Sequence, residues 1–402
     1  KSKIISNGGN RRKMEKNIES NRITLLLDNF DIDSKLLWES FLRTDYNCRA
    51  IVTGEESFLP EGVTSVYDFS LEDLEGKDRE DRRPKYFNEI AIPKEWRITA
   101  SGKIIYQHEQ KGKIYYADPK NKRFVKAIDW YDRKGIRRLS DYYNRYGEIF
   151  ARAIYDVRGR LINKSWFSRT GQEIIVQNYI TGSIILNEDG KVQIFRTKMD
   201  YILYFCAKKG LENDRVFFNS LSIPFFVSLN LSSSKKQDVL FWQEPIEEEI
   251  PGNMQIILGG AAKRTSHIVV QKRKSYDKLL ALGADREKIH SLGFIYSFKK
   301  ENHHLPKALI CTNSDHIEHC HEIVEALPDM QFHICALTDM SRKLTILEQY
   351  NNVFLYPNIP TDILTYLFDI CDYYFDINYE SEIVSAVREA FLHNQLIFAY
   401  QE

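Results

Sequence analysis

Four glycines recur at intervals of twelve residues in the middle of the chain. They are Gly135, Gly147, Gly159 and Gly171, and aromatic residues recur late in the units that they begin. A period of twelve fits one strand of about eight residues and a short turn, because strands average roughly 5–6 residues and hairpin loops 2–5. It is too short for the helix pair of a solenoid repeat. The spacing therefore predicts an antiparallel β-meander over about residues 84–197.

The segments on either side of the meander follow a different pattern. Apolar runs at 23–27 and 48–52 enclose a predicted helix at 34–42, and strands and helices alternate again from residue 198. Strand runs that are apolar on both faces and joined by helices are typical of parallel sheets covered on both sides. Near the end of the chain, strands are predicted at 308–311, 332–337, 353–356, 373–377 and 396–400, with helices at about 316–327, 342–349, 361–371 and 381–393.

The predicted fold class is therefore α/β, with a GT-B-like pair of Rossmann-like domains and an antiparallel β-meander domain inserted into the first. The charged run at 73–83 is expected to cross between domains. We also expect the C-terminal end of the second domain to be incomplete. The expected segments are an extension over 1–20, the first Rossmann-like domain over 21–83 and 198–300, the meander over 84–197 and the second Rossmann-like domain over 301–402.

Charge separates the meander from the rest of the chain. Residues 84–200 carry 23 Lys and Arg against 13 Asp and Glu, whereas the remainder carries 33 against 43, and the whole chain is neutral. Neutrality argues against a nucleic-acid partner. This basic excess has two alternative explanations. One is a solvated sheet face, and the other is a surface that docks an acidic partner or an anionic membrane. No apolar run reaches the roughly 20 residues needed to span a bilayer, so we expect a cytoplasmic protein.

The cysteine and histidine patterns point to no cofactor and no metal. The six cysteines are scattered without a CxxC pair, which predicts buried free thiols rather than disulfides or a zinc site. His316, His319, Cys320 and His321 share a predicted helix, but no carboxylate or second histidine pair accompanies them at metal-site spacing. We interpret these histidines as packing or solvent-facing residues.

Five segments carry a resemblance to a known family. They are YFNEIAIPKEW at 86–96, VKAIDWYDRKGIRRLSDYYNRYG at 125–147, QNYITGSIIL at 177–186, FFNSLSIPFFVSLNLSSSKKQDVLFWQEPIEEEIPGNMQ at 217–255 and YYFDINYESEIVSAVREAF at 373–391. With them the chain resembles, from about residue 23 to its end, the non-catalytic B subunits of the bacterial O-GlcNAc transferases that glycosylate serine-rich repeat adhesins.

The resemblance implies a role beside an enzyme. Such a protein stabilises and co-activates a catalytic A subunit in a heterodimer or heterotetramer. It binds the serine-rich repeat adhesin as the acceptor before export by the accessory Sec system. The implied location is the cytoplasm, with a peripheral position on the cytoplasmic face of the cell membrane left open.

Three positions argue against catalysis by this chain. In the retaining enzymes that it resembles, two glutamates eight positions apart contact the donor, whereas here Glu389 fits the second position and Ser381 stands at the first. No Arg or Lys lies between Cys311 and Met340, and burying a diphosphate without a paired cation is costly. The run at 226–230, matched to a donor-facing strand, has no His or acid. The sequence thus predicts a pseudoenzyme without catalytic residues. The alternatives are an active retaining GT-B glycosyltransferase and a purely structural scaffold.

The segment FWQEP at 241–245 is predicted to end a strand that points at a cleft between the two Rossmann-like domains. An aromatic plate with amide and carboxylate groups suits a serine-rich peptide, because these groups pack against it and hydrogen-bond to it. A structural tryptophan whose neighbours cap the turn is the alternative. The predicted acceptor-binding residues are Trp242, Gln243, Glu244 and Asn253 from the first domain, and Asn378 and Tyr379 from the second.

Overall fold

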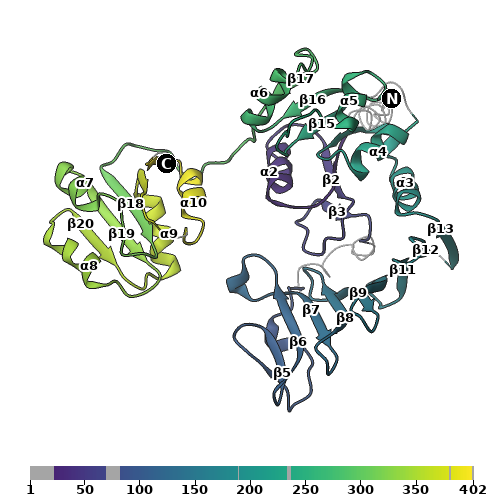
Figure 1. Cartoon of the computed structure of the whole chain (residues 1–402), viewed down its shortest axis with the longest axis horizontal. Helices are drawn as coiled ribbons and strands as arrows, with labels where there is room; N and C mark the ends of the chain where they lie inside the picture. Colours follow the sequence, from purple (N-terminus) through teal and green to yellow (C-terminus); the bar gives the residue numbers. More distant parts are fainter. Residues whose placement is uncertain (1–21, 69–81, 189, 233–236, 380–381, 401–402) are drawn as a thin grey trace, which may run out of the picture. The chain divides into compact units, whose positions relative to one another are not determined.

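The computed structural model describes residues 22–68, 82–188, 190–232, 237–379 and 382–400. These residues form a mixed α/β structure with three sheets, and their contacts divide the chain into two compact units after Ile295 (Figure 1). Within these ranges no helix combines the length and the apolar character that a membrane crossing requires.

The first unit contains a seven-stranded sheet in which every neighbouring pair is parallel. The strand order is β17-β16-β15-β14-β1-β2-β3. All five residues of the central strand β1 are buried, as expected for a strand covered on both faces. The bounds are β1 (Ile23–Leu27), β2 (Cys48–Val52), β3 (Val63–Ser65), β14 (Arg215–Phe218), β15 (Asp238–Trp242), β16 (Thr265–Val270) and β17 (Ile289–Ser291).

Helices enclose this sheet on both faces. Helix α2 (Ile32–Phe41) covers one face, where its apolar side chains pack against β1 and β2. The helix begins after Asp31, whose carboxylate accepts a hydrogen bond from the backbone N–H of Ser34 at 2.8 Å, and such an N-cap stabilises a helix start. The other face is covered by α3 (Lys198–Lys208), α4 (Ile223–Asn230), α5 (Gly252–Leu258) and α6 (Arg273–Ala281), with the 3-10 turn η4 (Leu211–Asn213).

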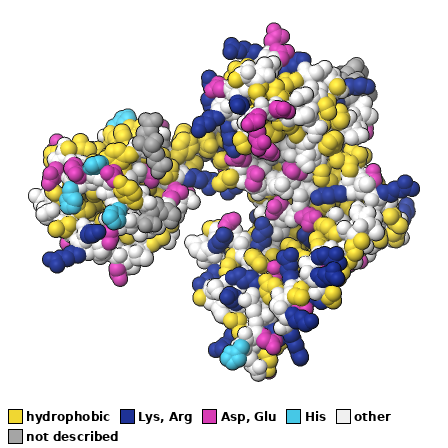
Figure 2. All heavy atoms as spheres, viewed as in Figure 1, with side chains coloured by type: hydrophobic (Ala, Val, Ile, Leu, Met, Phe, Trp, Pro, Cys, Tyr) yellow, Lys and Arg dark blue, Asp and Glu magenta, His cyan; other side chains and the backbone are white. Residues whose placement is uncertain are grey.

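Between β3 and α3 the chain forms a ten-stranded antiparallel sheet, in the order β13 to β4 without crossovers. The predicted antiparallel strands are thus confirmed, and Figure 2 shows Lys and Arg side chains gathered over this part of the first unit. The bounds are β4 (Arg97–Ile98), β5 (Lys103–Tyr106), β6 (Glu109–Tyr116), β7 (Val125–Tyr131), β8 (Arg137–Tyr143), β9 (Ile149–Tyr155), β10 (Leu161–Phe167), β11 (Glu173–Asn178), β12 (Ile184–Glu188) and β13 (Lys191–Phe195), with the 3-10 turns η2 (Phe87–Glu89) and η3 (Lys120–Lys122).

One repeated turn explains the twelve-residue period. In the turn between β9 and β10, the N–H of Gly159 donates to the carbonyl of Asp156 at 3.0 Å, and the glycine has a φ of 77°. Glycine adopts positive φ without steric cost. The Asp156 carboxylate also accepts from the amides of Arg158 and Arg160, at 2.8 and 2.9 Å. The glycine-to-carbonyl bond and the positive φ recur at Gly135, Gly147 and Gly171.

The second unit contains a five-stranded parallel sheet in the order β20-β19-β18-β21-β22. Helices α9 and α10 pack on one face of this sheet, and α7 and α8 pack on the other. All six cysteines of the chain are free, and five of them are buried. The bounds are β18 (Lys307–Thr312), β19 (Gln331–Ala336), β20 (Val353–Tyr356), β21 (Tyr373–Asp376), β22 (Leu396–Ala399), α7 (Cys320–Ala326), α8 (Arg342–Thr345), η5 (Ile346–Gln349), α9 (Thr361–Ile370) and α10 (Ala386–Leu392).

One predicted strand is wrong, and two predicted helices begin at the wrong residue. The run at 226–230 is not a strand but part of α4, which is started by a proline in its first turn. Helices α7 and α10 begin later than predicted, because His319 and Ser385, just before them, have φ of 48° and 53°. His316 is therefore not on a helix with His319. The division into five segments stays a prediction, and residues 1–20 and most of the charged run at 73–83 lie outside the described residues.

Candidate functional site

The carboxyl edge of the seven-stranded sheet has a point where the strand order reverses. In sequence order, strands β1 to β3 extend the sheet toward one edge, and strands β14 to β17 then extend it from β1 toward the opposite edge. Ligands of open α/β sheets bind beyond the strand ends at such a point. Asn219, directly after β14, accepts a hydrogen bond from the N–H of Asp28 at 3.0 Å and donates to Ser34 Oγ at 2.8 Å. The two central strand ends are therefore tied to the first turn of α2.

Gln243 belongs to the same polar network. It follows β15 and is 5% exposed. Its Nε2 donates to the Gln271 side chain at 2.7 Å and to the carbonyl of Asp33 at 3.1 Å, while its Oε1 accepts from Asn219 Nδ2 at 3.0 Å. Lys272 Nζ lies 2.8 Å from the Asp33 carboxylate at the outer side of this network. Gln243 thus organises the carboxyl edge from within.

Trp242 lies in the core. Its side chain is 4% exposed and belongs to the apolar cluster between the sheet and helices α3 to α6. Its Nε1 is buried, without a hydrogen-bond acceptor among the described residues. This placement favours the structural role that the sequence left open over that of an accessible aromatic plate.

Glu244 and Asn253 lie nearer the surface of the first unit. The Glu244 side chain is exposed, and its backbone carbonyl accepts from Ser275 Oγ at 2.9 Å at the start of α6. Asn253, in the first turn of α5, is half-buried and donates to the carbonyl of Leu221 at 2.9 Å. Of the four residues predicted in this unit, Glu244 offers the most accessible polar group.

Asn378 and Tyr379 lie at the corresponding point of the second sheet, where the order reverses between β18 and β21. An isolated antiparallel bridge joins Asn378 to Ile317, and the N–H of Tyr379 donates to the carbonyl of His316 at 3.2 Å. The Tyr379 hydroxyl bonds the Glu318 carboxylate, yet its side chain is 68% exposed. The loop after β18 is thereby held against the end of β21, with one aromatic ring presented to solvent.

Of the two positions predicted to be degenerate donor contacts, Ser381 lies outside the described residues. Glu389 lies on α10, and its carboxylate is 2.5 Å from Lys299 Nζ. Helix α10 begins at Ala386, so Glu389 lies in its first turn.

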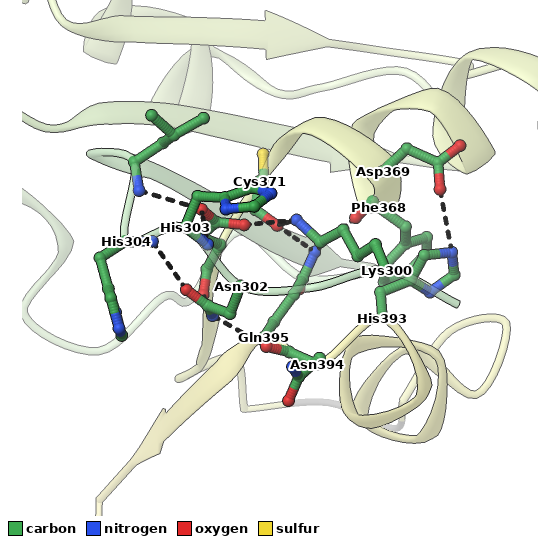
Figure 3. A network of polar contacts seen from close by, with 12 residues as sticks. Lys300, Asn302, His303, His304, Phe368, Asp369, Cys371, His393, Asn394 and Gln395 are labelled. Carbon is green, nitrogen blue, oxygen red and sulfur yellow. Dashed lines mark hydrogen bonds and ion pairs between the residues drawn. The ribbon is translucent and has the colours of Figure 1, made fainter. Parts of the chain in front are cut away.

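Within the second unit, a buried carboxylate binds the segment that carries Lys299. Asp372, 1% exposed, pairs with Lys300 Nζ and accepts from the amides of His303 and Leu305 at 3.0 and 2.9 Å. Figure 3 labels Lys300 and His303 of this network. Burial raises the pKa of Asp372, but these partners outweigh it and leave the pKa below its ordinary value. The lysine that binds Glu389 is thus held in place by its neighbours.

Lys164 is a residue that the sequence analysis missed. It lies on β10 and is 3% exposed, and its Nζ lies 2.7 Å from the carboxylate of Glu55. A signal for its burial was available in the sequence. Successive side chains of a strand alternate between faces, so Lys164 must lie on the same face as Trp166.

Four family models match the chain in sequence order. They are the GtfB N-terminal domain over residues 24–69, the GtfB middle domain over 96–196, the GtfB third domain over 198–282 and the GftB/GlyA-F C-terminal domain over 308–402. Together they account for most of the chain. Their limits follow the first sheet, the antiparallel sheet, the return to the first sheet and the second unit.

Relatives and a solved structure extend over nearly the whole length. The chain is similar to the UDP-N-acetylglucosamine–peptide N-acetylglucosaminyltransferase stabilizing protein GtfB of Streptococcus agalactiae, with 41% identity over 381 residues, 94% of this chain and 85% of the relative. The protein of the same name from Streptococcus gordonii is 38% identical over 383 residues, 94% and 84% of the two chains. A crystal structure of a GtfA/B complex bound to UDP and GlcNAc contains a chain with 39% identity and a TM-score of 0.84, over 94% of this chain and 85% of that one.

Proposed function

This chain belongs to the family of GtfB stabilizing proteins, and from that premise we propose that it is the non-catalytic subunit of a protein O-GlcNAc transferase. The observation that carries the proposal is the similarity to these proteins along 94% of the chain. In this role the chain stabilises a catalytic GtfA-type subunit and binds the serine-rich repeat adhesin whose Ser and Thr residues are glycosylated. The two parallel sheets, with the antiparallel sheet between β3 and α3, support a GT-B-like arrangement with an insert.

Two features of the second unit support the non-catalytic role. The stretch between Cys311 and Met340, which includes the carboxyl end of β18, has no Lys or Arg for a diphosphate. Glu389 is engaged by Lys299. This ion pair occupies part of the acceptor capacity that the carboxylate would otherwise offer to a sugar hydroxyl.

We expect that the purified protein alone neither hydrolyses UDP-GlcNAc nor transfers GlcNAc to a serine-rich peptide, because residues 312–339 contain no Lys or Arg for the diphosphate. UDP release measures this, with the catalytic subunit as the positive control. Turnover by this chain alone that is lost in Glu389→Gln would instead support an active retaining glycosyltransferase.

A surface of the antiparallel sheet supports partner binding. Val176 on β11 pairs with Ile185 on β12, which pairs with Ile194 on the edge strand β13. Paired residues of neighbouring strands project from the same face, and so does Val192, two residues before Ile194. Ile194 is 71% and Val192 66% exposed. We call these four residues the β13 patch. An exposed apolar edge strand is suited to pairing with another sheet, so we propose that the catalytic subunit covers it.

The surface residues at the two carboxyl edges are proposed to bind the acceptor. Each hydrogen bond to a serine-rich peptide contributes only about 0.5–1.5 kcal/mol, so an accessible aromatic ring is needed in addition to polar groups. Tyr379 supplies this ring in the second unit, and Glu244 supplies a carboxylate in the first. Trp242 is too deeply buried to supply it.

Tyr379→Ala is expected to weaken acceptor-peptide binding about tenfold, which is ~1.4 kcal/mol, because it removes a flat contact surface. Titration calorimetry with a serine-rich peptide measures the effect. Tyr366→Ala is the matched control, since Tyr366 is 58% exposed on α9 of the same unit. Equal affinities of the two variants would favour the scaffold function, in which the chain only supports its partner.

The cellular location of the protein is a prediction made from the sequence. We propose that the protein acts in the cytoplasm, where an adhesin is accessible before export. The excess of ten positive charges over residues 84–200 is compatible with a peripheral position on an anionic membrane.

A further inference from the structure

A buried ion pair joins the antiparallel sheet to the first parallel sheet. Lys164 on β10 pairs with Glu55, in the loop of residues 53–62 between β2 and β3, at 2.7 Å. The other Glu55 oxygen accepts from the Tyr179 hydroxyl at 2.6 Å. Lys164 Nζ also lies 3.8 Å from the centroid of the Tyr142 ring. Lys164 of β10 and Tyr179, in the turn after β11, thus contact one carboxylate of the 53–62 loop, and Tyr142 of β8 packs against the lysine.

Aromatic stacking extends this contact between the two sheets, which we call the Glu55–Lys164 joint. Tyr67, just after β3, stacks on Trp166 of β10 with ring centroids 4.2 Å apart and planes at 11°. Burial alone raises the pKa of Glu55, but the charge and hydrogen bond of Lys164, with the Tyr179 hydroxyl, outweigh it and lower the pKa. The joint therefore holds a charged, fully partnered carboxylate.

The same loop reaches the carboxyl edge of the first sheet on its other side. Thr53 Oγ1 donates to the Asp28 carboxylate at 3.2 Å. Gly54 lies so close that an added Cβ would stand 2.7 Å from the carbonyl oxygen of Asp28. The N–H of Asp28 donates to Asn219, which donates to Gln243. A continuous series of contacts thus runs from β10 to Gln243.

We propose that Glu55 and Lys164 are positioning residues that couple binding of the catalytic subunit at the antiparallel sheet to acceptor binding at the carboxyl edge of the first sheet. This inference rests on the proposed function. A partner seated on β11 to β13 restrains the strands that hold Glu55, and the 53–62 loop transmits the restraint to Asp28, Asn219 and Gln243. The antiparallel sheet and the carboxyl edge of the first sheet both contact the 53–62 loop, so the coupling depends on the Glu55–Lys164 joint.

The test uses a double-mutant cycle. Glu55→Gln and Lys164→Met each leave one buried group unpaired, and both variants should lose stability. The combined variant removes both charges and should regain much of it. Glu56→Gln is the matched control, because Glu56 joins the same loop to Lys126 of the same sheet through a more exposed pair at 3.4 Å.

The functional readout is the ratio of acceptor-peptide dissociation constants for the free protein and for its complex with the catalytic subunit. In the parent and in Glu56→Gln we expect a ratio of at least about fivefold, the lower end of typical coupling. In the combined variant we expect a ratio within twofold of one, although its stability is restored. If the combined variant regained the coupling together with its stability, the Glu55–Lys164 pair would be merely structural, and the inference would be overturned. The parent protein could also bind both the catalytic subunit and the acceptor peptide but with equal peptide dissociation constants in the free and complexed states. This result would overturn the inference and leave the proposed function intact.

A second readout requires no ligand. Spin labels on cysteines at Val157, in the turn after β9, and at Lys274, on α6, report the distance between the two sheets of the first unit. Both sites are exposed, and Cys48→Ser removes the one native thiol that is not buried. The distance distribution should be narrow in the parent and in Glu56→Gln, and broad in the combined variant. An equally narrow distribution in the combined variant would refute a positioning role even if the protein bound neither partner nor acceptor.

Discussion

Replacing Ile194 by aspartate is expected to weaken the complex with the catalytic subunit at least a hundredfold while the free protein keeps its stability. Ile194 is 71% exposed on the edge strand β13, and surface substitutions usually change stability by less than about 0.5 kcal/mol. In the complex the same carboxylate would be buried without a partner within the β13 patch. We expect at least a hundredfold loss of affinity, about 2.7 kcal/mol, measured by calorimetry and gel filtration.

Val157→Asp provides the control for Ile194→Asp. Val157 is 69% exposed and lies in the turn between β9 and β10, outside the β13 patch. It should leave the complex intact. Equal losses from both substitutions would indicate a general effect of negative charge on this basic sheet. No loss from Ile194→Asp would place the partner interface elsewhere on the chain.

Replacing Trp242 by alanine is expected to destabilise the first unit by about 3–5 kcal/mol, because removing a buried aromatic side chain leaves a cavity. In a unit of this size, such a loss lowers the melting temperature on the order of 10 °C. Differential scanning calorimetry measures the shift. Acceptor binding at a temperature where the variant is folded should stay within twofold of the parent, since the indole is in the core.

Trp242→Phe separates packing from recognition. It keeps most of the buried volume and removes an N–H that has no acceptor among the described residues. We therefore expect less than half of the loss caused by alanine. A stable Trp242→Ala variant with tenfold weaker acceptor binding would restore the interpretation of Trp242 as an acceptor contact.

Local patterns predicted the elements that depend on local physics. Strands β1, β2 and β20 match their predicted bounds, because short apolar runs between polar turns have few alternatives in an α/β chain. The glycine period predicted the antiparallel strands, because each glycine occupies a positive-φ turn position. The run at 226–230 was assigned to a strand by the match to a donor-facing strand, whereas the proline in the first turn of α4 favours the start of a helix.

The sequence by itself determined the mixed α/β class, the antiparallel strands and the family, since these depend on local periodicity and on matches along the whole chain. Only the tertiary structure decided what the side chains do. Trp242 and Gln243 stand next to each other in the sequence, yet one is a core residue and the other the centre of a polar network. Glu55 and Lys164 are separated by 109 positions. Their contact depends on the packing of one sheet against another, and no local pattern encodes which distant carboxylate a buried lysine will meet.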